Sequence, residues 1–339
     1  MKIAILNIYQ CEVARGAETF VSELSDRLSF RHNVDVFTEK KKPMRRWPII
    51  WRLFLDPPGI AIALFTLKQL PKIWKNKYEI VIPLNGGWQP ALLRLITWLY
   101  GGKMVISGQS GIGWDDRFNL WSFPDVFVAL SSKAKSWAGK VNPYIKKIVY
   151  IPNGVDLLKF SQEGSKYPVN IKEPIVLCVG ALSATKRIDL VIQAVSILKD
   201  VSLVVVGEGE LKVEIEKLGH KLLRERFKLI HLKHKDMPKI YRLANLFTLA
   251  PDVSEAFGIV YLEALSSGLP VVAIDDDIRR EIIGDAGIFV DPINIKHYAN
   301  AINDALNRYW GNKPREQAEK FGWHEIANKY ETVFSDLIR

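Results

Sequence analysis

The sequence predicts an α/β protein built from two Rossmann-like domains, each a doubly wound parallel sheet covered by helices on both faces. Apolar segments typical of buried strands alternate with segments of helical spacing along most of the 339 residues. This alternation, which implies parallel strands, stops over Leu157–Pro174 and then starts again. The chain is too long for one ordinary α/β domain and comfortable for two.

The elements of the first domain follow one another as strand, turn and helix. Short apolar runs predict strands, and apolar residues three and four positions apart predict helices. The strands expected are Lys2–Ile8, Asn33–Thr38, Glu79–Leu84, Lys103–Ser107, Val126–Leu130 and Ile148–Ile151, and the helices are Gly16–Leu28 and Gln89–Tyr100.

The second domain repeats this pattern after a polar, proline-containing linker. The boundaries predicted are residues 1–160, residues 161–315 and a helical tail, 316–339, that is free to pack on either domain. The strands expected are Ile175–Val179, Ser202–Val206, Lys228–Leu232, Leu246–Ala250 and Pro270–Ile274, and the helices are Ile188–Leu198, Leu211–Leu218, Pro238–Ala244, Ala256–Ser266 and Ile278–Ile283.

Positive charge is concentrated in one stretch of the first domain. Residues 40–77 hold ten Lys and Arg but a single acidic residue, which accounts for nearly all of the net charge of +10. The stretch also holds Trp47, Trp51 and Trp74. Basic residues mixed with Trp and aliphatic residues favour an anionic membrane surface as partner. Nucleic acid is disfavoured because no nucleic-acid motif is present, and a solvated insertion with a small core of its own is the remaining alternative.

The sequence favours a soluble, cytoplasmic protein. Its N-terminus lacks the long apolar region and cleavage site of a secretion signal. The longest apolar run, Gly59–Leu67, is about half of what a spanning helix needs. Cys11 and Cys178 lie in or beside strand-like runs, where reduced core thiols are expected.

Loops after the strands are the candidate sites, because open α/β sheets bind ligands beyond the carboxyl ends of their strands. Gly16 opens a helix after the first strand, where free N–H groups suit a phosphate or simply start the helix. Gly207 and Gly209 form a Gly-x-Gly pair after a strand. A dinucleotide fingerprint would need a third glycine where Lys212 stands, so a nicotinamide cofactor is disfavoured.

The strongest local pattern is a pair of glutamates, Glu255 and Glu263, around a predicted helix. On a helix, eight residues span about 12 Å. Glu255 would then lie at the N-terminal mouth and Glu263 further along the same broad face. A nucleotide sugar laid along this helix would meet both carboxylates, with its diphosphate near the helix N-terminus. Two surface glutamates flanking a core helix explain the spacing equally well.

The segment Ser254–Ala273 resembles the signature of family 4 of the retaining glycosyltransferases. The resemblance implies a GT-B fold, in which two Rossmann-like domains face each other across a cleft that holds the active site. It covers essentially the whole chain and is more specific in the second half. The other matching segments, in the expected order, are Arg15–Glu18, Ile151–Asp156, Val179–Lys186, Val206–Gly209, Asp236–Pro251 and Trp323–Phe334.

The resemblance also implies roles for individual residues. Glu255 would hydrogen-bond the donor sugar, and Glu263 would hold the ribose. Lys186 would neutralise the diphosphate as it leaves, and Gly16 would lie against the phosphates from the other domain. The remaining contacts implied are the backbone N–H groups of Phe257, Gly258 and Ile259 for the sugar and phosphates, and Leu232 and Lys233 near the base.

Two positions depart from the family pattern. Ala181 stands where many members have an Arg that pairs with the Lys, and Arg187 is the candidate replacement as donor-binding cation. The loop Ser107–Arg117 lacks the His that many members place near the reacting carbon. The candidates for its place are Gln109, Asp115 and Asp116.

Breaking a glycosyl–phosphate bond builds negative charge on the diphosphate, so helix dipoles and Lys186 are the expected aids. The resemblance implies attack from the same face, with retained configuration. Three consecutive aspartates, Asp275, Asp276 and Asp277, allow a metal site, but they precede a predicted helix, where capping is favoured. We therefore expect no metal or other cofactor, with the nucleotide sugar as a substrate.

The expected partners are a UDP- or GDP-linked sugar and a glycan or lipid-linked acceptor, in cell-surface polysaccharide or glycolipid synthesis. No nucleic-acid partner is expected. An epimerase or phosphorylase on the same architecture is one alternative. A non-catalytic protein that binds a nucleotide sugar is another, motivated by the missing Arg and His.

Overall fold

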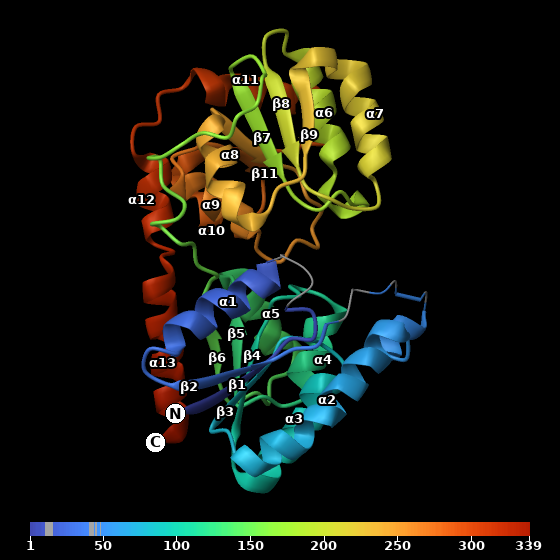
Figure 1. The fold of residues 1–339 in the computed structure, drawn as a ribbon, viewed down its shortest axis with the longest axis vertical. Helices are drawn as coiled ribbons and strands as arrows, with labels where there is room; N and C mark the ends of the chain where they lie inside the picture. The colour runs from blue at the N-terminus through green and yellow to red at the C-terminus, as the bar shows by residue number, and fades with distance from the viewer. Residues whose placement is uncertain (11–15, 41–43, 45, 48) are drawn as a thin grey trace. The chain divides into compact units, whose positions relative to one another are not determined.

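The computed structural model describes residues 1–10, 16–40, 44, 46–47 and 49–339. The chain divides into two compact units, residues 1–153 with 323–339 (unit 1) and residues 154–322 (unit 2) (Figure 1). Predictions that concern Cys11, Arg15 and part of the basic stretch fall outside the described residues.

Unit 1 is built on a six-stranded parallel sheet with the strand order β2-β1-β3-β4-β5-β6. Its strands are β1 (Lys2–Leu6), β2 (Asn33–Phe37), β3 (Ile80–Pro83), β4 (Lys103–Ser107), β5 (Val126–Ala129) and β6 (Ile148–Tyr150). Its helices are α1 (Gly16–Leu28), η1 (Ile50–Leu53), α2 (Pro57–Asn76), α3 (Trp88–Tyr100), α4 (Trp114–Trp121), α5 (Ser132–Val141) and α13 (Trp323–Ile338).

The strands of unit 1 divide their side chains between two apolar layers, one on each face of the sheet. In β1, Ile3 and Ile5 join the layer that contains α1 and α13, whereas Ala4 and Leu6 join the layer that contains α2 and α3. Alternation with a period of two is what a strand buried on both faces requires. Helices therefore cover both faces of this sheet, as predicted.

The last helix of the chain, α13, belongs to unit 1. The ring of Phe20 in α1 lies 6.0 Å from that of Trp323 and 5.8 Å from that of Tyr330. Arg31 adds an ion pair with Glu331 at 3.0 Å. This packing selects one of the two placements that the sequence left open for the tail.

The basic stretch contains a helix, α2, that the sequence did not predict. Its inner side, including Ala61, Ile62 and Phe65, packs into the same layer as β1 and β3. The alternative of an insertion with its own core is therefore wrong. Exposed apolar side chains on the side that faces away from the sheet hide this helix from a periodicity analysis, because apolar residues then occur on both of its sides.

The segment Ile50–Asn76, which comprises η1 and α2, is long and apolar enough to cross a membrane by length and composition. No other helix among the described residues meets both criteria. Of its most apolar window of 18 residues, 44% is buried in the protein. A core helix passes the same test, and the packing of Phe65 and Ile73 shows that α2 is part of a core.

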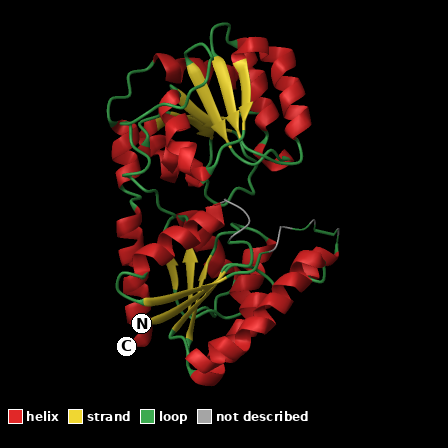
Figure 2. Cartoon of the chain, in the orientation of Figure 1, coloured by secondary structure: helices red, strands yellow, loops and turns green. Residues whose placement is uncertain are grey.

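Unit 2 repeats the architecture with the strand order β12-β11-β10-β7-β8-β9, again all parallel (Figure 2). Its strands are β7 (Ile175–Val179), β8 (Ser202–Val206), β9 (Phe227–Ile230), β10 (Leu246–Leu249), β11 (Val271–Ile274) and β12 (Gly287–Val290). Its helices are η2 (Ala184–Lys186), α6 (Ile188–Ile197), α7 (Lys212–Leu223), η3 (Arg224–Arg226), η4 (His234–Asp236), α8 (Met237–Leu243), α9 (Ile259–Ser266), α10 (Asp277–Ile283), η5 (Gly284–Ala286), α11 (Ile295–Asn307) and α12 (Lys313–Glu319). The two parallel sheets confirm the predicted fold class.

The units meet in sequence at residues 153 and 154, slightly before the expected boundary at residue 160. Phe160 belongs to unit 2 because its ring packs on Tyr241 at 5.7 Å and its carbonyl accepts hydrogen bonds from Ser266 and Arg315. The second crossing lies before Trp323 rather than at residue 316, since α12 is also part of unit 2.

Candidate functional site

Most of the predicted donor-site residues of unit 2 lie in loops at one edge of its sheet, and Ile259 and Glu263 lie in the helix α9 that follows one of these loops. All six strands are parallel, so their carboxyl ends share that edge. The loop after β7 carries Lys186, and the loop after β10 carries Glu255. Because β7 and β10 are neighbours in the sheet, with Val176 beside Leu246, the two loops start side by side. A hydrogen bond of 2.8 Å from Asp252 N to Thr185 O joins them.

Lys186 and Glu255 form an ion pair between these loops. The Lys186 ammonium donates to the Glu255 carboxylate, although the residues are far apart in sequence. Their side chains are 22% and 17% exposed, so the pair is reachable from solvent but partly desolvated. The two charges predicted to meet the diphosphate and the sugar are thus adjacent, as the neighbouring parts of one donor molecule require.

The helix after Glu255 starts later than the sequence predicted. α9 begins at Ile259, and residues 255–258 are not helical. Gly258 has φ of 88° and ψ of 70°, a left-handed conformation that cannot be part of an α-helix and that glycine adopts at little cost. The prediction that both glutamates lie along one helix is therefore wrong, because Glu255 lies in the loop before α9.

This loop leaves backbone donors at the start of α9. Among the described residues, no hydrogen-bond acceptor is found for the N–H groups of Phe257, Gly258 and Ile259. Such N–H groups and the helix dipole favour an anion. A Cβ on Gly258 would lie 2.7 Å from the ring of Tyr261, so a side chain there would disturb the turn.

A buried arginine, Arg279 of α10, holds the backbone of Glu255 in place. Its guanidinium donates to the Glu255 carbonyl oxygen at 3.1 Å and lies 3.3 Å from an oxygen of Asp276. The side chain is 1% exposed. The sequence analysis missed this residue. The one signal available was its position three residues after a capping aspartate, and that does not reveal burial.

Glu263, the residue predicted to bind the ribose, is buried. Its carboxylate accepts a 2.7 Å hydrogen bond from the Tyr241 hydroxyl, and the residue is 6% exposed. His234 lies 3.9 Å away, with its other ring nitrogen 2.9 Å from the Lys159 ammonium. Burial and the Lys159 charge lower the pKa of His234, so its neutral form is favoured.

The sequence analysis did not include Lys159, His234 or Tyr241 in the site. Lys159 comes from one segment, and His234 and Tyr241 come from the adjoining elements η4 and α8; they converge on Glu263 only through the fold. Lys233, which was predicted, is an exposed residue at the start of η4 in the same loop as His234. Its position permits contact with a ligand at this edge of the sheet.

Arg187 points toward backbone oxygens. Its guanidinium donates to the carbonyls of Ala250 at 2.9 Å and Pro251 at 2.8 Å. These bonds secure the end of β10 and the start of the loop that carries Glu255. Arg187 therefore positions this loop, and its charge remains close to the Lys186–Glu255 pair.

The Gly-x-Gly pair serves the packing of two loops. A Cβ on Gly207 would lie 1.9 Å from the carbonyl oxygen of Gly180, and one on Gly209 would lie 2.4 Å from that of Leu182. The N–H of Leu182 donates to the carbonyl of Glu208 at 2.9 Å. Glycine is thus needed for close approach of backbones, which accounts for the motif without a dinucleotide.

The three aspartates after β11 have protein partners. Asp276 caps α10 by accepting from the N–H of Arg279 at 2.8 Å, and Asp275 pairs with Arg280 at 2.6 Å. No cluster of three or more His, Cys, Asp or Glu with metal-binding geometry occurs in the ranges that the structure covers. Capping is the role that the sequence favoured for these residues.

In unit 1, Gln109 is held by a reciprocal amide pair. Its Nε2 donates to the Asn153 oxygen at 2.9 Å, and the Asn153 amide donates back at 3.0 Å. The same Nε2 donates to Ser107 Oγ at 2.9 Å, which lies 3.1 Å from the Tyr330 hydroxyl. Both ends of the Gln109 amide are engaged, so this arrangement favours a positioning role over direct contact with a sugar.

The two aspartates of the same loop differ in environment. Asp115 forms a two-pronged ion pair with Arg46, at 3.0 and 3.3 Å. Asp116 is buried and accepts from the Asn119 amide at 3.0 Å. Burial, assisted by the Asp115 charge, raises the pKa of Asp116 to about 7. Of the three candidates for the place of the missing His, Asp116 is the buried carboxyl.

We expect Asp116 to make unit 1 less stable as pH rises from about 5 to about 7. The unfolded carboxyl loses its proton around pH 3.8, whereas the folded one keeps it to about 7. The folded state binds more protons in this window, so its stability falls by about 1.4 kcal/mol per pH unit. Asp116→Asn should remove this fall in urea unfolding followed across the window. Asp26→Asn, on the exposed side of α1, is the control and should show the same fall in stability with pH as the unchanged protein. An unchanged slope in Asp116→Asn would contradict the assignment.

Gly16 is the first residue of α1 and is exposed. The residues before it lie outside the described part, so the phosphate contact expected there stays a prediction. Glu18, in the first turn, accepts from the Asn7 amide at 3.3 Å. This bond ties the start of α1 to the end of β1.

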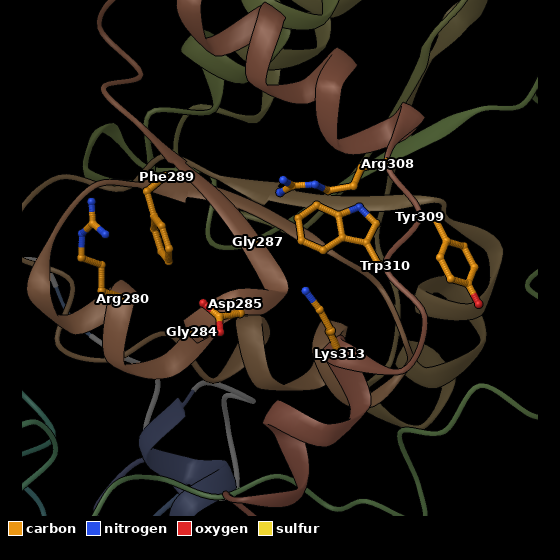
Figure 3. Close-up of a pocket in the computed structure, with 9 residues that line it drawn as sticks. All are labelled: Arg280, Gly284, Asp285, Gly287, Phe289, Arg308, Tyr309, Trp310 and Lys313. Atoms are coloured by element: carbon orange, nitrogen blue, oxygen red, sulfur yellow. The ribbon is translucent and has the colours of Figure 1, made fainter.

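A separate pocket of about 390 Å³ lies in unit 2, around the start of β12 and the connection between α11 and α12 (Figure 3). Arg308 lies over the ring of Trp310, and Arg280 lies over the ring of Phe289. None of the predicted site residues lines this pocket. It is distinct from the loops that hold Lys186 and Glu255.

Comparison with known proteins finds a family model that matches unit 2. Residues 161–322 match the model of the family "Glycosyl transferases group 1". The O-antigen biosynthesis glycosyltransferase WclY of Escherichia coli is 27% identical over 99% of this chain and 95% of its own length. A sulfoquinovosyl transferase of Arabidopsis thaliana is 27% identical over 47% of this chain, which spans only 32% of that relative.

Among solved structures, HepE of Anabaena in complex with UDP and glucose matches over 99% of both chains, with a TM-score of 0.77 and 17% identity. This likeness shows a shared fold, the expected GT-B architecture. The family match and the names of the relatives confirm the predicted enzyme class, a glycosyltransferase.

Proposed function

We propose that this glycosyltransferase moves a sugar from a nucleotide diphosphate donor to a glycan or lipid-linked acceptor, with retention of anomeric configuration, as in the family 4 enzymes that it resembles. The observation that carries the proposal is the Lys186–Glu255 contact in front of α9. A cation and a hydrogen-bonding carboxylate lie side by side at the carboxyl edge of the sheet, where open α/β sheets bind ligands.

The proposed chemistry follows from where charge develops. The departing diphosphate gains negative charge, and Lys186 with the N–H groups at the start of α9 would stabilise it. Glu255 would accept hydrogen bonds from the sugar hydroxyls, and Glu263 would hold the ribose. In the absence of donor, the positive charge of Lys186 and the negative charge of Glu255 compensate each other.

Retention is proposed without a covalent glycosyl-enzyme. Retaining hydrolases use two carboxylates about 5 Å apart, one of them a free nucleophile. Glu255 is bound to Lys186, and Glu263 is bound to Tyr241. Both carboxylates are thus engaged by protein groups, and we propose same-face attack by the acceptor, with its proton passing to the leaving phosphate.

The donor and acceptor are proposed at the level of class. A UDP- or GDP-linked sugar is the proposed donor, supported by the fold shared with HepE, which was solved with UDP. Synthesis of a cell-surface polysaccharide or glycolipid is supported by the likeness to an O-antigen enzyme. We place the protein in the cytoplasm, at the inner face of the membrane, where such acceptors would be lipid-linked. No metal or other cofactor is proposed.

The proposal is tested by incubating the protein with UDP-, GDP- and ADP-sugars in EDTA and measuring nucleotide release and sugar transfer. We expect release from one donor class, and NMR of the product should show the donor's anomeric configuration. An inverted product would rule out retention, and activity that requires an added divalent ion would rule out metal independence. Donor isomerisation without transfer would support an epimerase, transfer from a sugar 1-phosphate would support a phosphorylase, and donor binding without turnover would support a binding protein.

A further inference from the structure

Helix α2 carries a stripe of exposed apolar side chains on the side opposite the sheet. Ile60, Leu64, Leu67 and Trp74 are 48%, 53%, 48% and 47% exposed. Their spacing of four, three and seven residues places them along one line of an α-helix. The other side of α2 packs into the core of unit 1, so this stripe is a second apolar face, and it is exposed to solvent.

The neighbouring helix α3 extends the same surface. Leu95, Trp98 and Leu99 are 59%, 57% and 75% exposed. The two helices pack against each other (Figure 1). The ring of Trp74 lies 6.3 Å from that of Tyr100. We name the seven exposed residues of α2 and α3 the apolar face. Soluble proteins seldom expose so much contiguous apolar surface without an interaction partner.

Positive charge accompanies the apolar face, and negative charge is almost absent from it. Lys68, Lys72 and Lys75 are exposed on α2, and Lys77 follows directly after it. Between Ile50 and Asn76 the acidic residue is Asp56, which is buried as the N-cap of α2, and α3 has none. Lys68 pairs with Glu39 outside the helix, so its charge is partly compensated.

We infer that the apolar face is a docking surface for an anionic lipid bilayer, on which unit 1 lies as a peripheral protein. Apolar and Trp side chains beside Lys suit insertion into the headgroup region together with attraction to anionic lipids. A second copy of the chain is a poorer occupant because it would bring equal positive charge to the contact. Spanning is excluded by the core packing of Phe65 and Ile73.

The inference extends the membrane contact expected from residues 40–77 to α3. It rests on the proposed function only for the reason why the enzyme would dock on a membrane. A lipid-linked acceptor is confined to the bilayer surface, so an enzyme docked there meets it at high local concentration. Binding to vesicles without donor or acceptor does not depend on catalysis. A silent donor panel would therefore leave this inference standing, and failed vesicle binding would leave glycosyl transfer standing.

The test is co-sedimentation of the full chain with vesicles of phosphatidylcholine alone or mixed with phosphatidylglycerol. We expect binding to the anionic vesicles that weakens with salt. Leu64→Glu combined with Trp98→Glu should lower the partition coefficient by more than about tenfold, because two buried apolar side chains are lost. Lys75→Glu should lower it by about fivefold or more, from lost attraction to the anionic surface.

The matched control is Ile197→Glu, which places the same charge at a 49% exposed apolar residue of α6 in unit 2. It should bind vesicles like the unchanged protein. Circular dichroism melting of each variant checks that the fold is retained. Equal vesicle binding by the double variant and the control would overturn the inference. So would concentration-dependent self-association through this face without vesicle binding, which would make it a contact between copies.

Discussion

Lys186→Met is expected to lower the rate of sugar transfer by about a thousandfold, as the loss of a group that stabilises developing charge does in other enzymes. Lys186 is the cation nearest to Glu255 in the proposed donor site. Its effect should appear mainly in kcat, because the charge on the diphosphate grows as the bond breaks. Steady-state kinetics with the donor identified by the panel measure this.

Glu255→Gln should also lose activity, but the two changes together should cost less than their sum. The side chains contact each other, so removing one already alters the environment of the other. Lys212→Met is the matched control, since Lys212 forms an exposed pair with Glu208 in the same unit. A thousandfold loss in Lys212→Met, or full activity in Lys186→Met, would contradict the assignment.

Arg279→Met is expected to destabilise unit 2 by about 3 kcal/mol, the lower end of the range for breaking a buried ion pair. Its side chain is 1% exposed, and its loss removes the hydrogen bond to the Glu255 carbonyl and the ion pair with Asp276, whose other oxygen still accepts from the backbone N–H of residue 279. The loop that carries Glu255 should then be less well ordered before donor binds. We therefore expect a raised KM for the donor as well as a lower urea midpoint.

The adjacent residue provides the control. Arg280 is exposed and pairs with Asp275, and among the described residues no hydrogen bond or ion pair is found between its side chain and the Glu255 loop. Arg280→Met should change the urea midpoint and the KM little. Equal effects of the two substitutions would show that charge in α10, rather than the hydrogen bond to Glu255, is what matters. Rescue of the KM by Arg279→Lys would separate loss of positive charge from loss of the guanidinium geometry.

Most strands and helices were predictable because their signal is local. Burial on both faces makes the parallel strands near-continuous apolar runs, and β7 and β8 have every residue buried. The helices α4, α5 and α11 were missed, as were two elements with a mixed signal. β12 is at the edge of its sheet and only half-buried, and α2 combines a core side with an exposed basic and apolar side.

The candidate site was predictable in part for a similar reason. Lys186, Gly258 and Glu255 were found through the resemblance of short segments. Arg279, Tyr241 and His234 carry no such signal, since each acts on a predicted residue from a different loop or helix. Arg187 was found, but the groups that its side chain contacts could not be predicted, because these carbonyls follow β10, far along the chain.

By itself, the sequence determined the two α/β domains, the glycosyltransferase class and the chemical types of the donor-site residues, because periodicity and short motifs are properties of neighbouring residues. The tertiary structure decided which of these residues meet. Lys186 contacts Glu255 because β7 and β10 are adjacent in the sheet, and α13 joins unit 1 because Phe20 and Trp323 pack together. Such contacts depend on strand order and side-chain packing between distant segments, and neither is encoded in a local pattern.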